Sequence, residues 1–215
     1  MIDVNKIKKY YGHILTQVYA EDESPMHESI TQEVWDNIIA PLKLDKKTKI
    51  LDVGAGPGYF LQLCKEHGYK NVSGTVGTDE ELKVLKKKKL KAKKEDISFL
   101  SDKDGSLDFI FCRQVLEHSP WPYITLMEYN RVLKMGGQLY VETPCPDTDD
   151  RRHENNINHY SVFGLRMLSC LIDRAGFKID SPYNLSMPVV DNETKQKMNE
   201  TAFAIVATKT REFGD

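Results

Sequence analysis

A chain of 215 residues, 40% of them hydrophobic, can bury the core of one α/β domain, and its net charge of -2 argues against a general binder of nucleic acids or membrane surfaces. No apolar run is long enough to span a bilayer, and the first residues lack the apolar core of a signal peptide. The four cysteines are scattered, so we expect a cytoplasmic protein with reduced, buried thiols.

Residues 1–45 are predicted to form an N-terminal helical cap. Apolar residues recur there at helical spacing, and the segment 20–25 divides the cap into two helices. From residue 46 to residue 215, strand-like and helix-like segments alternate, which is typical of βαβ units in a parallel sheet. The predicted strands are 49–53, 71–76, 92–96, 107–112, 138–142, 177–180 and 201–208. The last two lack a long helix between them, which indicates an antiparallel hairpin.

This pattern predicts a single domain, 1–215, of the α/β class. We expect a Rossmann-like, seven-stranded, mostly parallel sheet with a terminal antiparallel hairpin strand and helices on both faces. In open α/β sheets, ligands bind beyond the carboxyl ends of the strands. That rule selects five segments as the functional edge of the sheet: 52–58, 76–79, 96–97, 113–118 and 143–160.

The most informative segment is ILDVGAGPGYF, residues 50–60. A run of β-forming residues is followed by three glycines at alternate positions, and glycine lets a ligand approach the backbone closely. A dinucleotide-binding loop has the spacing G-x-G-x-x-G, but Tyr59 occupies the position of its last glycine. The spacing therefore argues against a nicotinamide-dependent oxidoreductase and suits a cofactor that lacks phosphates.

With Asp52 before the glycines, this loop resembles the cofactor loop of class I S-adenosylmethionine (SAM)-dependent methyltransferases. Segments 108–118 and 131–144 are similar to the fourth strand, the Gly-Gly turn and the fifth strand of that family. Segments 158–161 and 174–177 recur in its branch of ubiquinone-biosynthesis O-methyltransferases and other small-molecule methyltransferases. The resemblance runs from about residue 49 to residue 208. It implies SAM as cofactor and a small-molecule acceptor, with a hydroxyl oxygen favoured; a degenerate fold that binds without catalysis is the alternative.

The resemblance also implies roles for particular residues. Residues around the methionine part of SAM would be Asp52, Gly54, Ala55, Gly56 and Gly58. Asp96 would accept a hydrogen bond from the adenine amine, and Ile97 would pack on the ring or donate its N–H. Further residues of the fourth strand and its loop would line the cofactor: Cys112, Arg113 and Gln114.

One position departs from the family pattern. The family usually ends its second strand in an acidic residue that holds both ribose hydroxyls, and Val76 stands there in this chain. Asp79 is a candidate replacement. A capping box formed by Thr78 and Glu81 is the simpler interpretation of this segment, and we favour it.

Methyl transfer to a hydroxyl benefits from a general base, and histidine is suited to that role near neutral pH. His118 is the first candidate and His159 the second, since both fall in predicted loops at the functional edge. The histidines lack a recognised metal-ligand spacing, so we expect no metal. Candidates to line the acceptor pocket are Tyr10, Tyr11, Met26 and His27, with a role in the core or in a helix cap as the equal alternative for each.

Eight lysines lie between residues 83 and 94. A patch that binds RNA would need interleaved aromatic residues and a basic chain, and neither is present. We interpret the run as a solvated helix face and expect no nucleic-acid or membrane partner.

Overall fold

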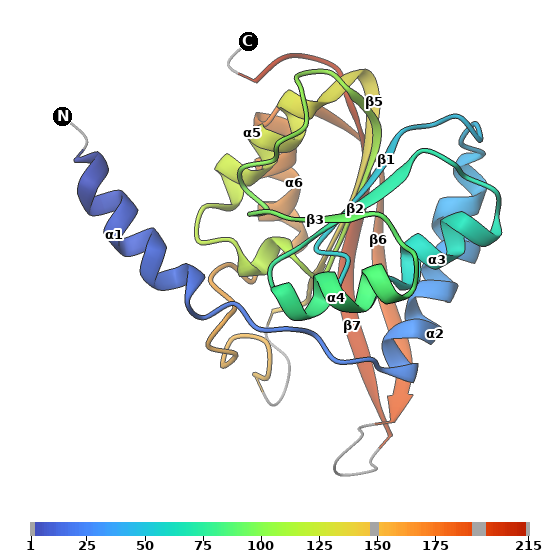
Figure 1. Cartoon of the computed structure of the whole chain (residues 1–215), viewed down its shortest axis with the longest axis horizontal. Helices are drawn as coiled ribbons and strands as arrows, with labels where there is room; N and C mark the ends of the chain where they lie inside the picture. The colour runs from blue at the N-terminus through green and yellow to red at the C-terminus, as the bar shows by residue number, and fades with distance from the viewer. Residues whose placement is uncertain (1–2, 147–150, 191–196, 214–215) are drawn as a thin grey trace.

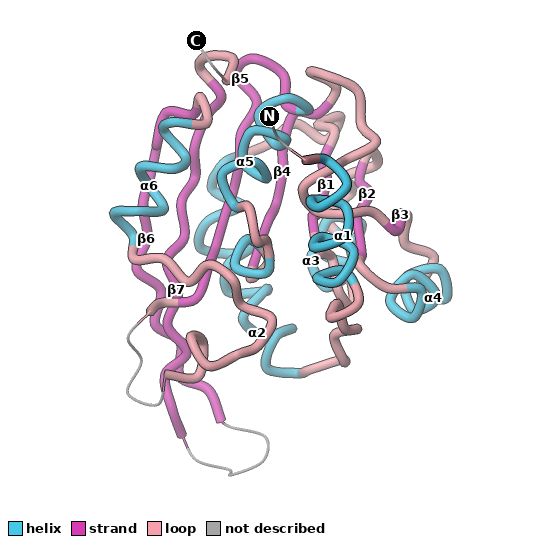
Figure 2. The backbone as a smooth tube through the Cα atoms, turned by 90° about the vertical axis from the view of Figure 1, so that its left-hand side faces the viewer, coloured by secondary structure: helices cyan, strands magenta, loops and turns pink. Residues whose placement is uncertain are grey.

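The computed structural model describes residues 3–146, 151–190 and 197–213. A seven-stranded sheet forms its centre, in the order β3-β2-β1-β4-β5-β7-β6 (Figures 1 and 2). The strands are β1 (Ile50–Val53), β2 (Val72–Val76), β3 (Ala92–Lys94), β4 (Leu107–Arg113), β5 (Leu133–Pro144), β6 (Phe177–Val190) and β7 (Lys197–Lys209). Strands β1 to β5 pair in parallel, and β7 is antiparallel to both β5 and β6. The predicted Rossmann-like sheet with its terminal hairpin is confirmed.

Helices cover both faces of this sheet (Figure 1). On one face lie α2 (Pro25–Val34) and α3 (Tyr59–Glu66), together with α4 (Asp79–Lys87), which packs on β2. On the other face lie α5 (Pro122–Val132) and α6 (Leu165–Arg174). Their apolar sides bury Leu126, Tyr129 and Ile172 completely against the central strands, as expected for two core layers around one sheet.

Two α-helices precede β1. Helix α1 (Val4–Leu15) has no buried residue and projects from the body of the molecule, whereas α2 packs on the sheet (Figure 1). A π-helical turn, Trp35–Ile39, and a 3-10 turn, Ala40–Leu42, continue α2 toward β1. Among the described residues, no helix has the length and apolar character that crossing a membrane requires.

The two strands of the terminal hairpin are longer than the sequence predicted. Strand β6 extends to Val190 although it contains Pro182 and Pro188, and β7 begins at Lys197. Proline cannot donate a ladder hydrogen bond, but β6 is the edge strand, where proline is tolerated. The hairpin therefore extends beyond the carboxyl ends of the parallel strands (Figure 2).

The expectation of buried thiols holds for two of the four cysteines. Cys64 and Cys112 are buried, but Cys145 is half-buried and Cys170 is exposed on α6. Cys170 lies on the solvent side of an amphipathic helix, so its position reflects helical periodicity and not a core role.

Candidate functional site

A cavity of about 1010 Å³ lies at the carboxyl ends of the parallel strands. Its walls come from the loops after β1, β2, β3 and β4, from the N-terminal segment, from residues 153–160 and from the hairpin. This is the edge of the sheet that the strand pattern selected. Hydrophobic residues such as Ile30, Leu185 and Met187 share the walls with many charged groups, so the cavity can hold a polar ligand with apolar parts.

Of the three glycines in the loop, Gly54 lines this cavity, whereas Gly56 and Gly58 do not. Gly54 lies on the cavity wall with a φ of 66°, and a Cβ there would meet a Val115 methyl group at 2.4 Å. Gly58 has a φ of 87° and begins α3, where a Cβ would collide with Leu85. Glycine is thus required at Gly54 by backbone conformation and by close packing beneath the cavity.

Asp52 lies at the end of β1, only 3% exposed. It lines a small neighbouring cavity of about 40 Å³ together with Gly54 and Ala55. Burial raises the pKa of the Asp52 carboxyl well above its usual range, although the Arg113 guanidinium opposes this shift. A cationic group arriving beside Asp52 would restore its ionised form.

A carboxylate that sequence analysis did not single out covers the loop. Glu21, in the segment between α1 and α2, pairs with His27. A Cβ built on Gly56 would meet Oε2 of Glu21 at 2.5 Å, so the N-terminal segment lies directly on the loop. The absence of a side chain at Gly56 is what allows this approach.

Asp96 and Ile97 lie at the opposite end of the cavity, after β3. Both oxygens of the Asp96 carboxylate have partners. Oδ1 accepts the Ser98 backbone N–H at 2.8 Å, and Oδ2 accepts the Tyr11 hydroxyl at 2.5 Å. The Tyr11 ring stacks on Trp121 with ring centroids 4.7 Å apart. Helix α1 therefore closes this end of the cavity.

Val76 is 1% exposed and lies in a core cluster, so nothing polar ends β2. Asp79 is exposed and its carboxylate bonds Lys94 at 2.7 Å. The capping box predicted for Thr78 and Glu81 is present. Glu81 itself, 8% exposed, lines the cavity, whereas Asp79 does not.

The end of β4 contributes Arg113 and Gln114 to the cavity wall, but Cys112 lies in the core, with Sγ 3.6 Å from the Tyr129 hydroxyl. Glu142 of β5 holds both of the lining residues. Its Oε1 is 3.1 Å from the Arg113 Nε and accepts a hydrogen bond from the Gln114 amide at 2.9 Å. Gln114 has a φ of 53°, a strained conformation that this partner helps to maintain.

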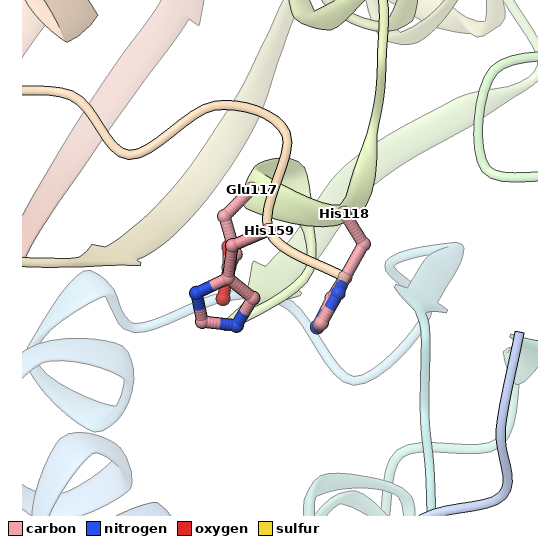
Figure 3. A group of neighbouring side chains, drawn as sticks. All are labelled: Glu117, His118 and His159. Atoms are coloured by element: carbon pink, nitrogen blue, oxygen red, sulfur yellow. The ribbon is translucent and has the colours of Figure 1, made fainter. Parts of the chain in front are cut away.

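Glu117, His118 and His159 meet on one side of the cavity, and their ligand atoms all lie within 4.8 Å of one another (Figure 3). The first two come from a 3-10 turn, Leu116–His118, and the third from the loop before α6. Nδ1 of His118 lies 2.9 Å from the Asn158 carbonyl, and Nδ1 of His159 lies 2.9 Å from the His153 carbonyl. Since a carbonyl only accepts, both rings carry their proton on Nδ1. Nε2 of His118 therefore keeps a lone pair, whereas Nε2 of His159 accepts a hydrogen bond from the Asn156 amide at 3.2 Å.

Burial sets the protonation of this cluster. It raises the pKa of Glu117 to about 8, with a further rise from Glu142, so the carboxyl is largely protonated at neutral pH. Burial lowers the pKa of His118, and it lowers that of His159 to about 4, helped by His118. Two imidazoles and a carboxyl oxygen could also hold a divalent transition metal. The sequence-based expectation that no metal binds stays a prediction.

Of the residues expected to line the acceptor pocket, Tyr11, Met26 and His27 lie on the cavity wall, whereas Tyr10 is exposed. Met187 and Glu200 also line the cavity but were not predicted to do so, because they lie in the parts of β6 and β7 beyond the predicted strand ends. It also left Glu117 without a role, although this residue stands beside His118 in a segment that carried the family resemblance. A buried acid next to a loop histidine was the available signal.

The chain is similar to known proteins in sequence and in fold. A family profile described as "Methyltransferase domain" matches residues 26–181. The chain is 29% identical over 159 residues to a tRNA U34 carboxymethyltransferase of Helicobacter acinonychis, covering 66% of this chain and 60% of that protein. It is 34% identical over 106 residues to malonyl-[acyl-carrier protein] O-methyltransferase 1 of Coxiella burnetii, covering 49% and 37%. It is 30% identical over 102 residues to a ubiquinone biosynthesis O-methyltransferase of Idiomarina loihiensis, covering 44% and 42%.

These matches span between 37% and 60% of the relatives' own lengths. Among solved structures, a SAM-dependent methyltransferase of Methanosarcina mazei has the same fold, with a TM-score of 0.65 at 22% identity over 82% of this chain and 99% of that chain. The ubiquinone branch is not singled out, because the tRNA U34 carboxymethyltransferase and the malonyl-[acyl-carrier protein] O-methyltransferase match as well. The chain belongs to the methyltransferase domain family, whose cofactor is S-adenosylmethionine.

Proposed function

We propose that this chain transfers a methyl group from SAM to a hydroxyl of an uncharged small molecule, with His118 as the general base. The residues of the cavity fit SAM. The side-chain-free Gly54 lies on its floor, Asp96 offers carboxylate oxygens at one end, and Asp52 lies beneath the loop at the other. The volume of about 1010 Å³ exceeds the need of the cofactor alone and leaves space for an acceptor.

The charge of the cavity carries this choice of acceptor. Among the described residues that line it, eight are acidic, although Glu117 is largely protonated at neutral pH, and two, Lys94 and Arg113, carry a permanent positive charge. Both cations are already paired, Lys94 with Asp79 at 2.7 Å and Arg113 with Glu142 at 3.1 Å. The acidic residues are Glu21, Asp22, Glu81, Glu95, Asp96, Glu117, Glu142 and Glu200. A carboxylate or phosphate acceptor would enter against this field without a free cation to receive it.

His118 supplies the proton acceptor. Nδ1 is held by the Asn158 carbonyl at 2.9 Å, which fixes the ring and leaves Nε2 unprotonated. Because burial lowers the pKa of His118, the ring is neutral at physiological pH and ready to take the hydroxyl proton. His159, whose pKa is about 4, is a weaker base; the two ring centroids are 4.9 Å apart, so it positions its neighbour.

When bound, SAM supplies an electrophilic methyl group on a sulfonium sulfur. The sulfur departs readily as a neutral thioether. The chain therefore has to align the acceptor, exclude water and hold the proton. Neutral Glu117 can donate its carboxyl proton to an acceptor oxygen or accept from its hydroxyl, since its Oε2 is buried without a partner among the described atoms.

The lysine run does not favour a nucleic-acid acceptor. Lys88 pairs with Glu23 at 2.7 Å, Lys93 with Asp102 at 3.1 Å, and Lys94 with Asp79. Three of the eight lysines are thus paired within the chain, which supports the interpretation of the run as a solvated face and the expectation of a small acceptor.

The test is a transfer assay with SAM that carries a deuterated methyl group. Acceptors share one aromatic scaffold bearing a hydroxyl, an amine or a carboxylate, and unmodified tRNA forms a fourth arm. Mass spectrometry locates the label. We expect labelled hydroxyl product. Label on the carboxylate or on tRNA would refute the proposed acceptor class. Label on the amine alone would agree with a cavity that disfavours anionic acceptors, but it would refute the proposal that the methylated atom is oxygen.

A further inference from the structure

Strand β2 does not end in a carboxylate, but a carboxylate from α4 lines the part of the cavity where the ribose of the cofactor would lie. We propose that Glu81, from the first turn of α4, accepts hydrogen bonds from the ribose hydroxyls of SAM. It would take the place of the acid that is missing at Val76. This inference concerns the cofactor and is independent of the acceptor proposed above.

Val76 itself has no means of binding a ribose. Its side chain is apolar and 1% exposed, packed with Leu61 and Leu85 in the core between α3, α4 and β2. Two ribose hydroxyls left without acceptors in a partly buried site would lose hydrogen bonds that they make in water. A site for SAM in this chain therefore needs another acceptor near the end of β2.

Glu81 occupies that place. The lining of the cavity runs from Gly54 of the glycine loop, past Gly77 and Glu81, to Asp96. The ribose lies between the methionine and adenine parts of SAM, so it has to lie between the glycine loop and Asp96. Gly77 has no Cβ to narrow this passage, which the Val18 side chain covers from the N-terminal segment.

The capping box holds the Glu81 side chain ready for this role. Oε2 accepts hydrogen bonds from the Thr78 backbone N–H at 3.1 Å and from its hydroxyl at 2.9 Å. Within the described residues, Oε1 accepts a single bond, a long one of 3.3 Å from the Glu21 backbone N–H. One oxygen therefore fixes the rotamer, and the other keeps a lone pair for a hydroxyl. Bonds to a carboxylate are among the stronger hydrogen bonds, and a fixed rotamer reduces the entropy lost on binding.

Asp79 provides a matched control, since it belongs to the same turn of α4 and has the same charge. It is exposed, it bonds Lys94, and it does not line the cavity. A general effect of negative charge at the start of α4 would appear equally in Asp79 and Glu81 variants. A contact with the ribose would appear only in Glu81 variants.

The experiment measures binding of S-adenosylhomocysteine, and of its 2′-deoxy and 3′-deoxy analogues, by calorimetry without any acceptor. Glu81→Gln keeps a side chain that can complete the capping box, so the fold is retained. We expect Glu81→Gln to weaken S-adenosylhomocysteine roughly 10–100-fold and Asp79→Asn to leave it within about twofold. Glu81→Asp, whose carboxylate is one methylene shorter, should weaken binding as well.

The analogues separate a contact from an indirect effect. In the unmodified protein, removing one ribose hydroxyl should weaken binding by roughly tenfold. In Glu81→Gln, the deoxy analogue should bind nearly as well as S-adenosylhomocysteine itself, because the contact is already lost. Equal losses in both proteins, or normal binding by Glu81→Gln, would overturn the proposal. Because no methyl transfer is measured, failure here would leave the proposed acceptor and His118 unaffected.

Discussion

The hydroxyl of Tyr11 donates a hydrogen bond to Oδ2 of Asp96 at 2.5 Å, which joins the exposed helix α1 to the end of the cavity that Asp96 lines. The Tyr11 ring also stacks on Trp121 and meets the edge of Phe99. Since α1 buries no residue, these contacts hold it in place. Tyr11→Ala should speed hydrogen exchange of α1 amides roughly tenfold, as measured by mass spectrometry. Tyr10→Ala is the control because Tyr10 is 61% exposed, and equal exchange in the two variants would contradict this anchoring role.

SAM binding should release a proton from Asp52. Burial holds the pKa of its carboxyl well above the usual range, and the positive amino group of SAM would lower that pKa. Affinity for SAM should therefore rise as pH increases through the pKa of the free protein. Calorimetry in buffers of different ionisation enthalpy should show proton release, and Asp52→Asn should abolish it. A binding enthalpy that is the same in every buffer would refute this role for Asp52.

The buried Glu117 should make the fold less stable as pH rises. Its pKa in the folded protein is about 8, above the ordinary value of 4.5, so the folded state keeps a proton that the unfolded state loses between these values. Glu117→Gln removes the ionisable group and should raise the melting temperature at pH 8 but hardly at pH 4. If the melting temperature changes equally at pH 4 and pH 8, burial does not destabilise the ionised carboxylate of Glu117.

Metal removal distinguishes the two chemistries open to the Glu117, His118 and His159 cluster. If Nε2 of His118 takes a proton, a chelator such as EDTA should leave methyl transfer unchanged, because a metal ligand has no lone pair left for a proton. Loss of activity with EDTA and recovery with zinc or manganese would instead identify the cluster as a metal site.

The core of the fold was predictable because its signals are local. The run of β-forming residues before Gly54, the three glycines and the helix pattern that follows all lie within about a dozen residues. Each of them supports the same strand-turn-helix unit. The capping box at Thr78 was equally readable, since its two partners stand three residues apart.

The far side of the cavity was not predictable, because it depends on long-range pairing. Pro182 ends a strand in most contexts, and only its place on the edge of the sheet allows β6 to continue and bring Met187 to the cavity. Likewise, Tyr11 and Asp96 are 85 residues apart, and periodicity within α1 carries no information about such a partner. Glu81 was recognisable as a capping residue, but its place on the cavity wall depends on how α4 packs beside the N-terminal segment.

The most direct test of the proposed chemistry is the pH dependence of turnover in His118→Ala, measured with the hydroxyl acceptor at saturating SAM. We expect turnover to fall by roughly 10²–10⁴-fold, the usual contribution of a general base, with unchanged affinity for S-adenosylhomocysteine. In the unmodified protein, turnover should fall as pH drops through a pKa below 6.5, and the variant should lose this limb. His159→Ala, the control, should keep the limb. Turnover in His118→Ala that keeps the same limb, or that falls only in step with cofactor affinity, would contradict the assignment of His118 as the base.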